Sequence, residues 1–315
     1  RTIAEFRKQN KEAIQNVFRQ LVSLCKGWDL FGMEVVAVDG SKFRACNSKR
    51  NNFNKKSLDR KIKYIDEKLD EYMSELDQND ASEVSSRVPG KDEINKRVKE
   101  LRRRKETYQK YQDELKEKKI NEISTTDPDA RLMAVNNNGV DVCYNVQTVV
   151  DSKHKLVVDC NVINNPTDHG QLSEMAVRAK KLFEADSIKA LADKGYYNAD
   201  DLKACEKEKI ITYVAKQVFS NTTGEEDFYS DKFEYNKERN VYICPAGYEL
   251  SCSIKKITKK TKRLNYKNTE ACSQCEYKDL CTTSKGGRVI VRTIDQDFLD
   301  TVDLRTSENK ELYKT

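Results

Sequence analysis

The sequence predicts an α/β fold in which a mixed sheet is covered by helices. Two observations support this class: short apolar runs bounded by turn residues, which are typical of strands, and amphipathic runs with helical spacing between the later strands. The predicted strands are 33–43, 142–151, 155–165, 188–192 and 210–216. Helices are predicted at 199–208 and at 168–186, where one face holds Leu172, Met175, Ala176, Ala179, Leu182 and Phe183.

The composition excludes membrane and secreted classes of protein. Of the 315 residues, 37% are hydrophobic and 35% are charged, which predicts a soluble globular chain long enough to bury a core. No run of about 18 apolar residues is present, so no membrane span is expected. The start shows no signal-peptide pattern, and a cytoplasmic location is predicted. The net charge of +6 fits a polyanionic partner but does not require one.

Two long helical regions flank the first predicted strand. Residues 1–30 are predicted to form an N-terminal helical segment, and residues 55–120 an antiparallel helical hairpin. Apolar residues at steps of three and four indicate the first helix of the hairpin: Leu58, Ile62, Ile65, Leu69, Met73 and Leu76. Its turn is expected around Ser85, Ser86, Pro89 and Gly90. The hairpin follows the first strand and its turn, 31–54, and is therefore predicted to be an insertion.

The order of the predicted elements is that of a ribonuclease-H-like sheet. A strand and the insertion are followed by two strands of a hairpin, a helix, a strand, a helix and a strand. The rest of this core is assigned to 121–218, a basic cysteine-rich insertion to 219–292, and the start of a C-terminal helix region to 293–315. In such a sheet the first and fourth strands are neighbours. Asp39 ends the first and Asp193 ends the fourth, so the two are expected to face each other.

Two facing aspartates suit a divalent metal site. Carboxylate oxygens are the ligands that Mg²⁺ and Mn²⁺ prefer, and a third carboxylate typically completes the cluster. Two such ions, about 3.5–4 Å apart, can activate an attacking oxygen and stabilise a leaving one in phosphodiester displacement. The alternative is that Asp39 and Asp193 only cap turns before Gly40 and Gly195.

Several segments resemble bacterial insertion-sequence transposases of the DDE type. They include VAVDGSKFRACNSKRNNFNKKSLDRKI, STTDPDARLM, VCYNVQTVVDSKHKLVVDCNVINNPTDHGQLSEMA, ALADKGYYNADDLKACEKEKIITYVAK and YICPAGYEL…CSQCEYKDLCT. The resemblance implies that Asp39 and Asp193 are the first two catalytic carboxylates and hold Mg²⁺ or Mn²⁺, two ions in an intact relative. It also implies DNA cleavage and strand transfer, with double-stranded DNA (terminal repeats and target) as partner, a homo-oligomer on DNA, and a place at the bacterial nucleoid.

The third catalytic residue of that family is a glutamate in a Tyr–Arg–Glu–Lys-type helix. ENKELYKT resembles the approach to this helix, with Tyr313 as its tyrosine, and the glutamate is expected just beyond Thr315. Glu308 and Glu311 do not follow the motif's tyrosine and arginine. The chain is therefore expected to be truncated at both ends. The alternatives are a non-catalytic DNA-binding or regulatory fragment and a metal-dependent nuclease that cuts without joining.

Five of the ten cysteines gather between 244 and 281, and the other five are isolated. A two-residue spacing separates Cys272 from Cys275, and with Cys281 and Cys244 they could form a four-thiolate zinc site. The alternative is reduced cysteines in a loop-rich, basic insertion.

Residues 244–292 hold eleven Lys and Arg against four Asp and Glu, which predicts phosphate binding. The clearest candidates are Lys255, Lys256, Lys259, Lys260, Lys262 and Arg263. Further DNA-binding candidates are Lys42, Arg131, Lys194 and Tyr196. Arg131 either contacts phosphate or stabilises a turn, and Tyr196 either stacks on a base or packs against the sheet. Asp168 is expected to cap the helix that follows it.

Overall fold

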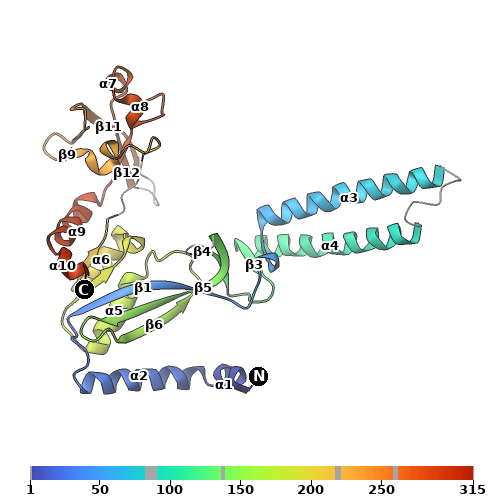
Figure 1. Cartoon of the computed structure of the whole chain (residues 1–315), viewed down its shortest axis with the longest axis horizontal. Helices are drawn as coiled ribbons and strands as arrows, with labels where there is room; N and C mark the ends of the chain where they lie inside the picture. Colours follow the sequence, from blue (N-terminus) through green and yellow to red (C-terminus); the bar gives the residue numbers. More distant parts are fainter. Residues whose placement is uncertain (1, 82–90, 136–138, 217–220, 258–261, 315) are drawn as a thin grey trace. The chain divides into compact units, whose positions relative to one another are not determined.

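The structure, a computed structural model, describes residues 2–81, 91–135, 139–216, 221–257 and 262–314. It has the mixed α/β architecture that the sequence predicts. The chain divides into two compact units. The core unit comprises 1–39, 147–161 and 167–315, and the insertion unit comprises 40–146 and 162–166. Figure 1 shows their elements along the chain.

A six-stranded mixed sheet has the order β4-β5-β1-β7-β8, and β6 also pairs with β5. Its strands are β1 (Val35–Arg44), β4 (Arg131–Val135), β5 (Gly139–Asp151), β6 (Val157–Ile163), β7 (Ile188–Ala192) and β8 (Ile210–Val214). β1, β7 and β8 are parallel neighbours, whereas β4 is antiparallel to β5. Four of the five residues of β7 are buried, as expected for a parallel strand between two others. The predicted strands are present, but β4 was not predicted.

Amphipathic helices pack on this sheet through apolar residues that recur at helical spacing in the sequence. The helices of the core unit are α1 (Thr2–Gln9), α2 (Lys11–Gly27), α5 (Leu172–Phe183), α6 (Ala199–Lys207), α9 (Gln296–Glu308) and α10 (Lys310–Lys314), with the two short helices α7 and α8 described below. One face of α5 is buried and joins the core cluster formed by Val36, Val38 and Ala190. In the described part of the chain, no helix is long and apolar enough to cross a membrane.

The start of α5 is capped from another helix, which corrects the prediction for Asp168. The buried carboxylate of Asp201, in α6, accepts hydrogen bonds from the backbone N–H groups of Leu172 at 3.1 Å and Ser173 at 3.0 Å. Asn198 in turn caps α6. Asp168 lies in the loop before α5, and its side chain accepts a hydrogen bond from Gln147.

The N-terminal helices carry an apolar face that is mostly exposed. Val22 is 5% exposed and packs on the core cluster, whereas Val17 is 64% exposed. Other exposed apolar residues of this segment are Ile3, Phe6, Ile14, Leu21, Leu24 and Trp28. The predicted helical segment is thus present, but only one edge of it belongs to the core.

The insertion unit contains the predicted helical hairpin, formed by α3 (Lys55–Ala81) and α4 (Lys91–Glu117) (Figure 1). A short two-stranded sheet, β2 (Asn52–Asn54) with β3 (Glu122–Ser124), closes its base. Leu58, Ile65, Ile94 and Val98 are buried, as their spacing predicts, but Met73 is 44% exposed. An ion pair of 2.6 Å joins Lys105 to Asp66 across the two helices. The predicted turn residues Ser85, Ser86, Pro89 and Gly90 lie outside the described residues.

The region predicted to be a loop-rich insertion contains a second sheet, which we call the small sheet lobe (residues 226–293). Its five antiparallel strands have the order β13-β12-β11-β10-β9. They are β9 (Glu234–Asn236), β10 (Val241–Ile243), β11 (Glu249–Ile257), β12 (Lys262–Lys267) and β13 (Ile290–Thr293), and the lobe also holds α7 (Thr269–Ser273) and α8 (Lys278–Cys281). Its core is small: Phe233, Tyr242, Leu250, Tyr266, Cys281 and Ile290.

Candidate functional site

The carboxylates of Asp39 and Asp193 follow paired residues of two neighbouring strands. β1 and β7 run parallel with Val38 paired to Ala192, so the next residue of each strand is one of the two aspartates. Both are exposed to solvent. The predicted adjacency of these strands is confirmed. Asp39 does not end its own strand, because β1 continues to Arg44; it marks the point where the pairing with β7 stops.

Asp193 also caps the short turn after β7. Its Oδ1 accepts a hydrogen bond of 2.8 Å from the backbone N–H of Gly195, which closes the 3-10 turn Lys194–Tyr196. A side chain at position 195 would disturb this arrangement. A Cβ there would lie 2.9 Å from Oδ1 of Asp193 and 3.5 Å from Oδ2 of Asp168. The capping role leaves Asp193 exposed, so it is compatible with a further role for the same carboxylate.

Asp168 is a third carboxylate at this place, and sequence reasoning missed it. The position that a Cβ of residue 195 would occupy lies near both Asp168 and Asp193, so the two carboxylates lie close to each other. Oδ1 of Asp168 accepts a hydrogen bond of 2.8 Å from Nε2 of Gln147, a buried residue of β5. Its sequence signal, an aspartate between a strand and a helix, was equally well explained by helix capping.

Tyr196 is buried beside these carboxylates, so its ring is not exposed for stacking on a base. It is completely buried, and its hydroxyl donates a 2.5 Å hydrogen bond to Oε1 of Gln147. Burial raises the pKa of Tyr196 above its usual range, and the carboxylates of Asp168, Asp39 and Asp193 raise it further. Its burial favours packing against the sheet over the DNA-stacking interpretation of Tyr196.

The C-terminal helix α10 reaches the end of β7. The hydroxyl of Tyr313 donates a hydrogen bond of 2.7 Å to the carbonyl oxygen of Ala192, the residue before Asp193. Burial raises the pKa of Tyr313, and the charge of Asp193 raises it further. The next residue back, Leu312, packs against Val35 and Leu191. The tyrosine singled out in the sequence therefore lies beside the second aspartate.

The basic candidates occupy different surroundings. Lys194 is exposed and directly follows Asp193. Lys42 lies on β1 in the insertion unit and is partly buried. Arg131 donates from Nη1 to the carbonyl oxygens of Pro128 at 2.6 Å and Ala130 at 2.9 Å. These bonds favour the turn-stabilising interpretation of Arg131 over phosphate contact.

The cluster of lysines falls on the β11–β12 hairpin of the small sheet lobe. Lys255 and Lys256 belong to β11, and Lys262 and Arg263 to β12. Lys256 pairs with Arg263 in the antiparallel register, and the side chain of Arg263 is exposed. Lys259 and Lys260 lie outside the described residues. Phosphate binding by this hairpin stays a prediction.

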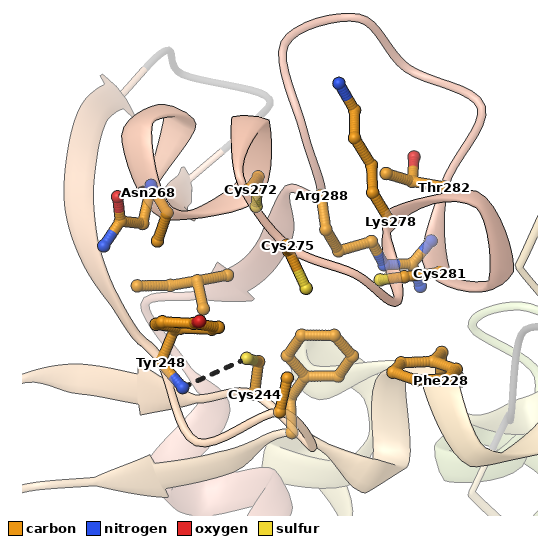
Figure 2. A pocket seen from close by; sticks show the side chains of 14 residues that line it. Phe228, Cys244, Tyr248, Asn268, Cys272, Cys275, Lys278, Cys281, Thr282 and Arg288 are labelled. Atoms are coloured by element: carbon orange, nitrogen blue, oxygen red, sulfur yellow. Dashed lines mark hydrogen bonds between the residues drawn. The ribbon is translucent and has the colours of Figure 1, made fainter.

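Four cysteines of the small sheet lobe line one pocket (Figure 2). Cys244 follows β10, Cys272 lies in α7, Cys275 follows α7, and Cys281 ends α8. The spacing therefore singled out side chains that do converge. The fifth cysteine of the region, Cys252, does not line the pocket but packs against the lobe's core. All ten cysteines of the chain are free thiols.

Neither cluster is already arranged as a metal centre. Among the described residues, no three His, Cys, Asp or Glu side chains stand together at a spacing that would hold an ion. The two groups offer different donors: the exposed carboxylates where the β1–β7 pairing stops suit Mg²⁺ or Mn²⁺, and the thiols in the lobe suit zinc. Searches against protein-family models, curated proteins and solved structures found no match for this chain.

Proposed function

We propose that this chain is the catalytic part of a DDE-type DNA transposase with a ribonuclease-H-like core, and that it cleaves and joins DNA at insertion-sequence ends. The observation that carries the proposal is the parallel register of β1 and β7, in which Asp39 and Asp193 follow the paired residues Val38 and Ala192. Open α/β sheets commonly place functional groups at the carboxyl ends of their parallel strands, and the parallel pairing of β1 with β7 ends at these two aspartates. The motif resemblance adds the reaction class.

Asp39 and Asp193 would hold divalent ions, and their surroundings fit this role. Both are exposed and offer hard oxygen donors, and the carboxylate of Asp193 lies near the third carboxylate, that of Asp168. Bound Mg²⁺ or Mn²⁺ would supply activation of the attacking oxygen and stabilisation of the leaving oxygen. The hydrogen bonds from Gln147 to Asp168 and from Gly195 to Asp193 hold two of the carboxylates in place.

The remaining residues would bind and position DNA. Lys194 is exposed directly after Asp193, where an ammonium group can contact the phosphate that is attacked. The basic β11–β12 hairpin would bind the sugar–phosphate backbone. Tyr313 ties α10 to the end of β7. A glutamate placed after it in the same helix, as in the family, would approach Asp193 from that side.

The first test measures Mn²⁺ binding, because it needs only the two aspartates. Calorimetric titration of the chain is compared with Asp39→Asn, Asp193→Asn and the matched control Asp200→Asn, an exposed aspartate of α6. The proposal predicts that each of the first two variants lowers affinity by roughly 10-fold or more, while the control binds like the wild type. Unchanged affinity in both site variants would contradict the assignment.

The second test follows DNA. Supercoiled plasmid is incubated with the chain and Mg²⁺ or Mn²⁺, and nicked and joined products are separated. Joined products that disappear in Asp39→Asn and Asp193→Asn support a transposase. Nicked products without joining support a metal-dependent nuclease. DNA binding that produces no nicks, and that both variants retain, supports a regulatory DNA-binding fragment.

A further inference from the structure

The four cysteines of the small sheet lobe come together from three separate stretches of the chain. Cys244 lies in the turn after β10, Cys272 and Cys275 surround the end of α7, and Cys281 closes α8. All four line one cavity of about 30 Å³. Figure 2 shows Cys244 across this cavity from Cys272 and Cys275. A space of this size takes one ion or a water molecule but no organic ligand. The other walls are largely apolar and include Phe228, Phe233 and Leu250.

The turn that carries Cys244 is shaped around its sulfur. The backbone N–H of Tyr248 donates to Sγ of Cys244 at 3.3 Å, and the backbone N–H of Cys244 donates to the carbonyl oxygen of Tyr248 at 2.9 Å. Gly247, with φ of +82°, makes the tight turn and donates to the carbonyl oxygen of Cys244 at 2.8 Å. These three hydrogen bonds fix the turn that presents Cys244 to the cavity.

The opposite wall fits closely around Cys272. Gly287 has a φ of +84°, and a Cβ at that position would lie 2.5 Å from Cβ and 2.8 Å from Sγ of Cys272. Only glycine fits there, because any side chain would occupy the space of the thiol and strain the backbone. The loop before β13 is therefore packed directly against one of the four sulfur atoms.

Charge around the cavity is arranged for anions. Arg288 lines the same pocket, and its buried Nε has no hydrogen-bond partner in the described structure. A buried donor without an acceptor is costly. A cluster of thiolates around a cation would offset it.

We propose that Cys244, Cys272, Cys275 and Cys281 bind one structural Zn²⁺ ion as four thiolates. Thiolate donors select zinc among the redox-inert divalent ions, and four protein ligands leave no open position for catalysis. The sulfur atoms are not yet at ligand spacing, so binding turns the side chains further into the small cavity. Arg288 then faces the excess negative charge of the cluster.

Zinc would supply stability that the lobe's own core lacks. Among the described residues of the lobe, six buried side chains form that core, with a few partly buried ones packed on it, and cores of this size contribute little to stability. The ion would join the β10 turn, α7 and α8 around a single point. Because such sites rarely exist in the unfolded chain, the binding free energy becomes folding free energy.

The experiment measures metal content and cobalt spectra, neither of which depends on DNA cleavage. The chain is purified without chelators, its zinc is quantified by mass spectrometry, and Co²⁺ is exchanged into it. Expected are about one zinc per chain and the charge-transfer and d–d bands of tetrahedral cobalt thiolate. Cys272→Ser and Cys275→Ser should each lower zinc content by roughly 10-fold or more, whereas Cys252→Ser, the matched control in the same lobe, should retain it.

Folding is tracked in parallel so that an unfolded variant is not misread. Chelation of the wild type should lower the melting temperature of the lobe, and added Zn²⁺ should restore it. The proposal is overturned if neither zinc nor cobalt binds the folded wild type. It is also overturned if Cys272 and Cys275 form a disulfide in the isolated protein, or if Cys252→Ser loses zinc as the other variants do. A failure of zinc binding would leave the Mn²⁺ titration at Asp39 and Asp193 unaffected, so the two proposals fail separately.

Discussion

Replacing Gly195 with alanine tests whether the position of the Asp193 carboxylate matters. The new Cβ would lie 2.9 Å from Oδ1 of Asp193, and ordinary contacts begin near 3.4 Å, so the carboxylate must move by about 0.5 Å. Its neighbour Asp168, at 3.5 Å, is only touched. The backbone itself is not strained, because Gly195 is not among the positive-φ glycines. The change is therefore local and leaves every charge in place.

The expected effect on function is larger than the effect on stability. The atom that yields is the end of a side chain, so the free energy of unfolding should fall by less than about 1 kcal/mol. Displacing a metal-holding group is more severe: supporting residues typically change affinity or activity by roughly 10–100-fold, and about 1 Å of misplacement can cost roughly 100-fold in rate. For about 0.5 Å we expect a loss near tenfold.

The assay is the Mn²⁺ titration, with nicking measured alongside it. Gly27→Ala is the matched control, because nothing lies within 4 Å of a Cβ at Gly27 and its φ is not positive. The reasoning is refuted if Gly195→Ala binds Mn²⁺ like the wild type while Asp193→Asn does not. A fall in the melting temperature comparable to that of a core cavity would also refute it, since the effect would then be one of folding.

Three further predictions concern stability. Val22→Ala should lower the free energy of unfolding by about 2 kcal/mol, whereas Val17→Ala, on the exposed face of the same helix, should change it by less than about 0.5 kcal/mol in denaturant titrations. Asp201→Ala removes the acceptor of two backbone N–H groups and should cost about 3 kcal/mol, against about 0.5 kcal/mol for the exposed Asp200→Ala, by the same measurement. Burial, with a hydrogen bond to an aspartate, raises the pKa of Tyr144 from 10 to about 12. The stability from this phenol should be intact below pH 10 and lost as the pH rises towards 12, and Tyr144→Phe should flatten this alkaline loss in melting curves.

The local sequence pattern was sufficient to predict the helices and strands that bury one regular face. The helical spacing of Leu172, Met175 and Ala179 predicted α5, and the apolar run ending at Asp193 predicted β7. The strands that were missed are short or polar. β4 and the strands around Tyr235 and Tyr242 acquire their structure from cross-strand partners, which a single-sequence pattern does not contain.

The candidate site was predictable where one residue carried its own signal. Asp39 and Asp193 each follow an apolar run, and the register of β1 and β7 places both directly after paired residues. Asp168 carried no distinct signal, because its partner Gln147 lies far back in the sequence, on β5. The capping role expected of Asp168 is taken by Asp201, further along the chain. The sequence left two interpretations of Tyr196 open, because an aromatic residue beside a charged group gives the same pattern whether it points outward or into the core.

The long excursion between β1 and β7 has a consequence for how the chain is made. At ~5–20 residues per second, the ribosome needs on the order of ten seconds after completing β1 to deliver its partner β7. During that time α3 and α4, whose contacts are local, can fold by themselves. Once the sheet is assembled, doubling the length of such a loop costs only about 0.6 kcal/mol. A longer hairpin would therefore delay the pairing of β1 with β7 much more than it would lower the stability of the assembled sheet.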